Sequence, residues 1–378
     1  MLGSPDNGVP VLRTEEARRR RVLMPLFVLV VLAVVVLLLT AAGRRTEVVG
    51  SGSTLAQPLI ERSAVDYRNS RSADDPQRPG ATGGDWIMDG SGSGVDYEAV
   101  GSLGGIMRLS DPDVDFAVAD YPLTRAALAG QRVVQFPLAI GAVAVVHGLD
   151  LGGRPLRLDA TTVADVYLGR ITRWDDPALA ALNPGTPLPP RPITAVHRTD
   201  GSGSTLAVTR YLAEGSPAWA KSPGAGTEVA WPTGRGVERS AGVVAAVRDD
   251  PGAIGYVEHG QATRAGVQVA RLENGRGEFV APDEGSIGAA VAGTDFSGKD
   301  DYAAGLAAPT TTGAYPLAAA VFALVEPGRR ETRAVLRYLD FVIDSSDAAA
   351  RDLGYVPLSE DAAEAVRSYR ASALHGNG

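Results

Sequence analysis

One heptapeptide occurs twice in this chain, and the repeat limits the possible folds more than any other feature of the sequence. Gly-Ser-Gly-Ser-Thr-Leu-Ala stands at residues 50–56 and again at 201–207, and residues 90–94 form a shorter relative of both. The apolar spacing around all three segments predicts a strand before each one and a helix after it. Strand–loop–helix units that recur in this way indicate an α/β fold.

The hydrophobic pattern predicts further strands and helices that alternate along the chain. Strands are expected at 47–49, 86–88, 114–119, 133–146, 191–196, 253–257 and 319–325. Helices are expected at 54–69, from 95 to about 109, at 161–168, from the second repeat to about 213, and at 241–247, 330–343 and 362–374. Residues 70–85 collect Pro, Gly and charges without periodicity, which predicts a surface loop.

A Gly-Ser loop at the start of a helix is suited to hold a small anion. The helix N-terminus exposes unpaired N–H groups and a partial positive charge, and Gly lets the backbone approach the anion closely. Ser and Thr hydroxyls add further donors. Three such loops that converge would surround one oxyanion. The alternative, that each Ser or Thr is an ordinary N-cap, stays open at this point.

Charged residues near the loops extend this prediction. Arg198 offers a planar fork of donors that suits a tetrahedral oxyanion, and Asp200 is close enough in sequence to hold that fork. Asp120 ends a predicted strand, and a carboxylate can only accept hydrogen bonds. It therefore tolerates an oxyanion that keeps a proton and disfavours a fully ionised one. An unpaired buried charge costs about 3–5 kcal/mol, which is enough to discriminate between the two.

The composition excludes several classes of site. The chain has no Cys and only four scattered His, which excludes disulfides and thiolate sites and argues against a transition metal. Its net charge of −8 argues against nucleic-acid binding. No Lys follows the Gly-Ser loops and no Ser lies at the centre of Gly-x-Ser-x-Gly, so neither a nucleotide loop nor a nucleophile elbow is predicted.

No enzyme activity and no cofactor are expected. A phosphoester hydrolase that uses a Ser near His197 is the alternative from another class of protein. It would need a general base within hydrogen-bond reach and usually a metal ion, and the sequence offers neither clearly.

Residues 22–42 carry no charge and are long enough to span a bilayer, which takes about 20 residues. Four consecutive Arg at 18–21 precede this run, whereas Arg44 and Arg45 follow it. The positive-inside rule therefore predicts a cytoplasmic tail at 1–21, one transmembrane signal anchor in the cell membrane, and an extracytoplasmic remainder. Cleavage near 40–42 is the alternative. The tail carries +2, so the remainder carries −10, and a bound anion must be held by local donors.

Several longer segments resemble the PstS family, the phosphate-binding subunits of the phosphate ABC importer. These segments are Val114–Leu123, Tyr167–Ile171, Trp174–Pro177, Leu182–Gly185, Arg198–Thr205 and Pro251–Glu258. The resemblance covers nearly all of 47–378. It implies a two-lobed, periplasmic-binding-protein-like α/β fold with hinge strands, in which 46–136 and 314–378 form lobe I and 137–313 form lobe II.

The resemblance also implies the function and the contacts of the ligand. The expected phosphate-binding residues are Thr54, Leu55 (through its backbone N–H), Ser93, Asp120, Arg198, Asp200, Ser202, Gly203 and Ser204. A monomer is expected that binds inorganic phosphate and passes it to the permease and ATPase subunits of the importer. A membrane-tethered phosphate or oxyanion sensor or scavenger, uncoupled from transport, is the alternative. The predicted membrane helix departs from the lipidated Cys that is common in this family.

Overall fold

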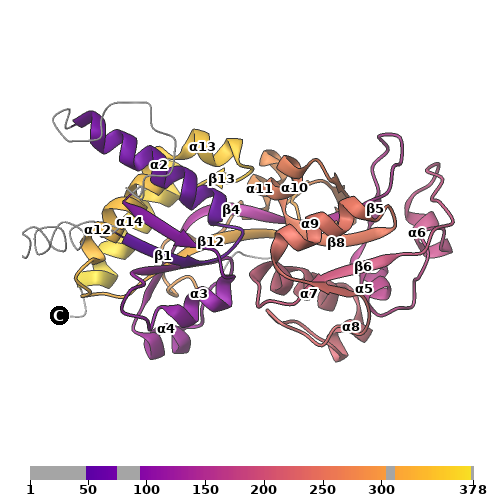
Figure 1. Cartoon of the computed structure of the whole chain (residues 1–378), viewed down its shortest axis with the longest axis horizontal. Helices are drawn as coiled ribbons and strands as arrows, with labels where there is room; N and C mark the ends of the chain where they lie inside the picture. Colours follow the sequence, from indigo (N-terminus) through magenta and orange to yellow (C-terminus); the bar gives the residue numbers. More distant parts are fainter. Residues whose placement is uncertain (1–47, 75–93, 304–310, 376–378) are drawn as a thin grey trace, which may run out of the picture. The chain divides into compact units, whose positions relative to one another are not determined.

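The computed structural model describes residues 48–74, 94–303 and 311–375, in which strands and helices alternate (Figure 1). The strands are β1 (Val48–Gly52), β2 (Val95–Glu98), β3 (Phe116–Ala119), β4 (Val134–His147), β5 (Arg157–Leu158), β6 (Thr194–Arg198), β7 (Arg235–Val237), β8 (Ala253–Glu258), β9 (Gln268–Val269), β10 (Arg271–Glu273), β11 (Phe279–Val280), β12 (Ala318–Val325) and β13 (Val356–Pro357). The helices are α2 (Gln57–Asp74), α3 (Ser102–Arg108), α4 (Arg125–Gln131), α5 (Ala160–Tyr167), α6 (Pro177–Leu182), α7 (Gly203–Gly215), α8 (Pro217–Lys221), α9 (Arg239–Asp249), α10 (His259–Ala265), α11 (Glu284–Val291), α12 (Thr332–Ser345), α13 (Asp347–Asp352) and α14 (Glu360–His375). The predicted α/β class is confirmed.

Most of these strands belong to one large sheet. Along it the order is β2-β1-β3-β12-β4-β8-β6-β7, and β9 and β13 pair with β4 beside this path. β1 is parallel to β2 and β3, and β6 is parallel to β7 and β8. We call β1, β2 and β3 the β1 end of the sheet, and β6, β7 and β8 its β6 end.

The long strand β4 connects the two ends of the sheet. From Val134 to Ala142 it pairs antiparallel with β12, and from Val143 to His147 it pairs antiparallel with β8. All 14 residues of β4 are buried. Its sequence is correspondingly a nearly unbroken apolar run, as in strands covered on both faces. The two ends of the sheet therefore share one continuous backbone.

A contact between two glycines sets α3 against β1. A Cβ atom on Gly105 of α3 would lie 2.3 Å from the Cα atom of Gly52, the last residue of β1. Gly52 itself has a φ of +143°, which side chains rarely allow. The backbone N–H of Gly101 donates to the carbonyl oxygen of Gly52 at 2.9 Å, so α3 begins beside the end of β1.

Two expectations for this region are wrong. Residues 95–98 form strand β2 rather than a helix, because Val95 and Tyr97 favour extended backbone and pair alongside β1. The helix begins only at Ser102, after Gly101 turns the chain with a φ of +86°. Residues 70–74 of the loop expected at 70–85 belong instead to α2, and the rest of that segment lies outside the described residues.

Other expectations fall outside the described residues. These are the strand at 86–88, the cytoplasmic tail at 1–21 and the transmembrane helix at 22–42. Within the described ranges, no helix has both the length and the apolar character that crossing a bilayer requires.

The packing of α3 on β1 predicts the effect of a methyl group at Gly105. Gly105→Ala should destabilise the fold, because the new Cβ atom meets the backbone of β1. Gly130 in α4 is a matched control, since a Cβ atom there finds nothing within 4 Å. In a helix Ala is favoured over Gly by roughly 0.5–1 kcal/mol. Urea denaturation should show a lower free energy of unfolding for Gly105→Ala and an equal or higher one for Gly130→Ala; equal effects would contradict the close packing.

Candidate functional site

Side chains at the carboxyl ends of four strands meet at one place. They are Thr54 after β1, Asp120 after β3, Arg198 at the end of β6 and Glu258 at the end of β8. β1 and β3 are parallel, and so are β6 and β8, so each pair presents its carboxyl ends at a common edge. Ligands of open α/β sheets usually bind at such an edge.

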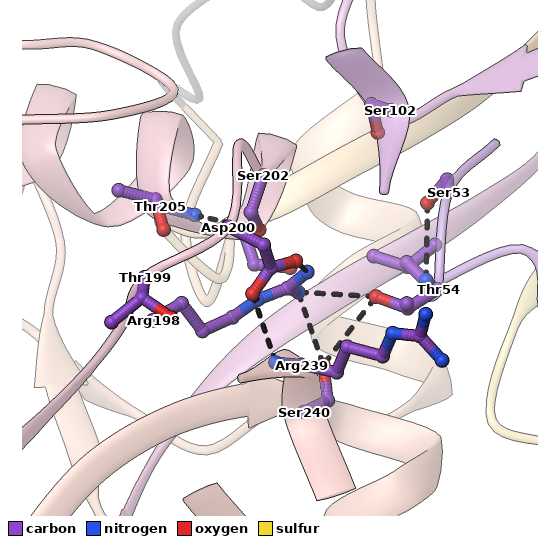
Figure 2. A network of polar contacts seen from close by, with 12 residues as sticks. Ser53, Thr54, Ser102, Arg198, Thr199, Asp200, Ser202, Thr205, Arg239 and Ser240 are labelled. Atoms are coloured by element: carbon purple, nitrogen blue, oxygen red, sulfur yellow. Dashed lines mark hydrogen bonds and ion pairs between the residues drawn. The ribbon is translucent and has the colours of Figure 1, made fainter. Parts of the chain in front are cut away.

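Arg198 lies at the centre of this cluster and is only 3% exposed. Its Nε donates to Oδ1 of Asp200 at 3.1 Å, and its Nη2 donates to Oδ2 of the same carboxylate. Its Nη1 donates to the hydroxyl oxygens of Thr54 at 3.0 Å and Ser240 at 3.1 Å (Figure 2). The two-point pair fixes the plane of the guanidinium. Among the described residues Nη2 donates only to Asp200, so its second N–H can donate to a ligand.

Buried carboxylates stabilise the charge of Arg198. Burial lowers the pKa of this guanidinium, but Asp200, Glu258 and Asp120 outweigh it, so the pKa lies above its ordinary value. Burial likewise pushes the pKa of Asp200 upward, whereas its contacts with Arg198 bring it below the ordinary value. Asp200 also accepts the backbone N–H of Arg239 at 2.8 Å. Asp200 is thus held as a carboxylate and fixed between two partners.

Asp120 is a second buried acid, 6% exposed. Its Oδ1 accepts the hydroxyl of Ser102, and its backbone N–H donates to the same hydroxyl at 3.3 Å. Burial raises the pKa of Asp120, and the hydroxyl of Ser102 and the charge of Arg198 offset only part of that rise. A Cβ atom on Gly203 would lie 1.7 Å from Oδ1, so only glycine leaves room there. The first residue of α7 therefore lies directly against the carboxyl group.

Glu258, 5% exposed, gathers hydroxyl groups from three segments. Its Oε1 accepts the hydroxyls of Ser240 at 2.8 Å, Thr54 at 2.9 Å and Ser204 at 3.3 Å. Nη1 of Arg198 lies 3.5 Å from the same oxygen. The other oxygen, Oε2, is buried and has no hydrogen-bond partner within the described ranges. The two ends of the sheet therefore meet through hydrogen bonds between side chains.

The structure brings most of the predicted site residues together, while others serve local structure. The residues in this one cluster are Thr54, Asp120, Arg198, Asp200, Gly203 and Ser204. The hydroxyl of Ser202 caps α7 by accepting the backbone N–H of Thr205 at 3.3 Å. This contact uses a lone pair of the hydroxyl and not its proton, so the role of Ser202 in phosphate binding stays a prediction. The backbone N–H of Leu55 donates to the hydroxyl of Ser53 at 3.0 Å. Ser93 lies outside the described residues.

The sequence patterns do not predict Ser102, Ser240 or Glu258 as site residues. Glu258, the last residue of β8, carries a signal like that of Asp120, an acidic residue at the end of a buried apolar strand, so the same pattern predicts it. Ser102 follows a glycine at a helix start, but the longer Gly-Ser run at 90–94 is the stronger match and directs the prediction upstream. Ser240 has no comparable signal, because Ser is common in the first turn of a helix.

The raised pKa of Asp120 predicts that this acid destabilises the fold when it ionises. The folded protein holds the proton more tightly than the unfolded chain, so stability is lost as the pH rises above the ordinary pKa of 3.8. Asn cannot ionise, so the Asp120→Asn variant does not lose this stability as the pH rises. Urea denaturation should show a higher free energy of unfolding than wild type at about pH 7, and the gain should shrink as the pH falls toward 3.8. Asp113→Asn, at an exposed residue, is the control; an Asp120→Asn effect that is independent of pH would contradict the prediction.

Comparison with known sequences identifies relatives over most of the chain. Residues 40–346 match the model of the PBP superfamily domain. The phosphate-binding protein PstS of Xylella fastidiosa is 32% identical over 333 residues, which are 87% of this chain and 86% of that protein. The phosphate-binding protein PstS of Haemophilus influenzae is 34% identical over 282 residues, which are 74% of this chain and 84% of that protein.

Solved structures share the fold at lower sequence identity. A phosphate-binding protein from Stenotrophomonas maltophilia matches with a TM-score of 0.59 and 19% identity, over 86% of this chain and 94% of that one. A high-affinity periplasmic phosphate-binding protein with bound phosphate matches with a TM-score of 0.62 and 20% identity, over 86% and 93%. These likenesses show the shared fold, while the family model and the sequence relatives show the family: the chain belongs to the PBP superfamily and, within it, to the PstS family.

Proposed function

We propose that this protein is a monomer that binds inorganic phosphate outside the cytoplasm and delivers it to an ABC-type importer, without making or breaking a bond. Relatives named phosphate-binding protein PstS support the ligand. One observation carries the proposal: a buried guanidinium with a free donor lies beside a buried acid and hydroxyl groups from three segments. These groups belong to Arg198, Asp120, Thr54, Ser102 and Ser204.

Each group has a distinct task toward phosphate. Arg198 supplies the positive charge, and Asp200 keeps its donors aimed. The N-terminus of α7, which begins at Gly203, adds partial positive charge and backbone donors. Asp120 accepts a hydrogen bond from an oxyanion that retains a proton. Sulfate carries no proton at neutral pH, so it would leave the charge of Asp120 buried without a hydrogen bond. An unpaired buried charge costs about 3–5 kcal/mol, which corresponds to a factor of about 10²–10³ or more in affinity.

We further propose the two-lobed division, with 46–136 and 314–378 in lobe I and 137–313 in lobe II. Thr54 and Asp120 then belong to one lobe, and Arg198 and Glu258 to the other. The sheet supports a division within β4, because this strand passes from its pairing with β12 to its pairing with β8 between Ala142 and Val143, a few residues after the proposed boundary. Hinge closure around the ligand is the motion that such an arrangement permits.

Calorimetric titration of the purified full-length chain, freed of endogenous ligand, tests the proposed function. Phosphate should bind one to one with about −8 kcal/mol or better, which is near micromolar, and sulfate should give no heat. Arg198→Ala should abolish phosphate binding, because it removes the buried positive charge. Arg173→Ala is the control, because it removes an exposed ion pair with Asp175. This variant should bind phosphate as wild type does.

Two outcomes would contradict this reading of the site. Equal affinity for phosphate and sulfate would show that Asp120 does not select between the two anions. Binding of neither anion would assign this member of the family to a different ligand.

We also propose that residues 22–42 anchor the protein in the cell membrane as a single span, with residues 1–21 in the cytoplasm. The charge-free run and the Arg residues before it support this topology. After alkaline carbonate washing, the full-length chain should stay with the membranes. Replacing Leu32 and Val35 by Asp costs about 2.5–3.5 kcal/mol per residue at the centre of a span and should lower the membrane-bound fraction. Release of a shortened wild-type chain would instead show cleavage.

A further inference from the structure

A single carboxylate oxygen collects the hydroxyl groups around Arg198. Oε1 of Glu258 lies within hydrogen-bond distance of the hydroxyls of Thr54, Ser204 and Ser240. A hydroxyl has one proton and two lone pairs. Every hydroxyl that donates to Glu258 therefore has no proton left for a ligand and can only accept from it.

The contacts with Arg198 fix the direction of these protons. Nη1 of Arg198 donates to the hydroxyl oxygens of Thr54 and Ser240, and an arginine cannot accept a hydrogen bond in return. The proton of Thr54 must then point elsewhere, and the carboxylate of Glu258 at 2.9 Å is a charged acceptor, favoured over the Ser240 hydroxyl at 3.4 Å. One lone pair of Thr54 is used by Arg198, and the second is left for a ligand.

The negative charges of the cluster also favour a protonated ligand. Three buried or partly buried acids, Asp120, Asp200 and Glu258, surround one guanidinium in this part of the described structure. The charge of Glu258 contributes to the raised pKa of Asp120, so the two acids influence each other across the site. A ligand that enters with fewer charges and more protons is repelled less and finds more acceptors.

We propose that Glu258 determines which oxyanions the site accepts, by holding the protons of the surrounding hydroxyls. With Glu258 ionised, Thr54 and Ser204 present lone pairs and favour a protonated oxyanion such as phosphate over a fully ionised one such as sulfate. This selection rests on the proposed phosphate-binding function. Asp120 selects the protonated oxyanion by direct contact. Glu258 adds a second selection, which acts through the neutral hydroxyls of Thr54 and Ser204.

The variant Glu258→Gln separates this role from that of Asp120. Glutamine keeps the size of the side chain but replaces one carboxylate oxygen by an amide group that can only donate. Where that amide faces the hydroxyls, they accept from it and turn their protons toward the ligand. Where the amide oxygen faces them, a neutral acceptor holds their protons less strongly than the carboxylate does. The full-length variant and wild type are titrated with phosphate and with sulfate. The ratio of the Kd for sulfate to the Kd for phosphate should fall about tenfold, through tighter sulfate binding.

Glu238→Gln is the matched control, because it makes the same change of charge at an exposed residue just before α9. Its ratio should equal that of wild type; an equal fall in both variants would assign the effect to net charge and overturn the proposal. An unchanged ratio in Glu258→Gln, with phosphate still bound, would also overturn it.

A further variant keeps the proposal testable if thermal unfolding shows that Glu258→Gln does not fold. Glu258→Asp retains the charge but withdraws the oxygen from the hydroxyls, so it should lower the ratio in the same direction, and an unchanged ratio would overturn the proposal. Failure of wild type to bind phosphate is a different result, because it overturns the proposed function itself.

Discussion

The site depends on a guanidinium that is buried and cannot lose its proton. Removing such a charge from water is costly unless it is paired and hydrogen-bonded. Asp200 supplies the pair from the β6 end of the sheet, and Thr54 supplies a hydroxyl acceptor from the loop after β1. The full set of partners of Arg198 is therefore present only when both ends of the sheet are folded and in contact. The contacts that stabilise the charge of Arg198 are thus the contacts that assemble the site.

Glycines allow the two ends to approach where these polar groups meet. A Cβ atom on Gly101, before α3, would lie 2.6 Å from the carbonyl oxygen of Gly201, in the loop before α7. Gly203 leaves the space that the carboxyl group of Asp120 occupies. Bulkier residues at these positions would hold the loops apart and leave Arg198 and Asp120 without their partners. In the Gly-Ser loops, the glycines allow the close approach and the Ser and Thr hydroxyls supply hydrogen bonds, and both are needed for the cluster.

The sequence predicts what is encoded locally and misses what depends on distant partners. The apolar run of β4 and the spacing of Arg198 and Asp200 along one extended segment are visible in a short window. The contact between Thr54 and Glu258 joins residues 204 positions apart, and neither segment contains a pattern that names the other. The helix expected from residue 95 shows a related weakness: pairing beside β1, a tertiary effect, makes that segment a strand.

The position of β12 has a consequence for how the protein is made. This strand lies between β3 and β4 in the sheet, yet it is synthesised long after both of them. Until residues 318–325 arrive, β3 and β4 each present an unpaired edge, and such edges invite association with other chains. Pairing over so long a stretch of chain is also slow, since the loop must close before the contacts form. Completion of the polar cluster around Arg198 therefore waits for a strand that contributes none of the residues described in it.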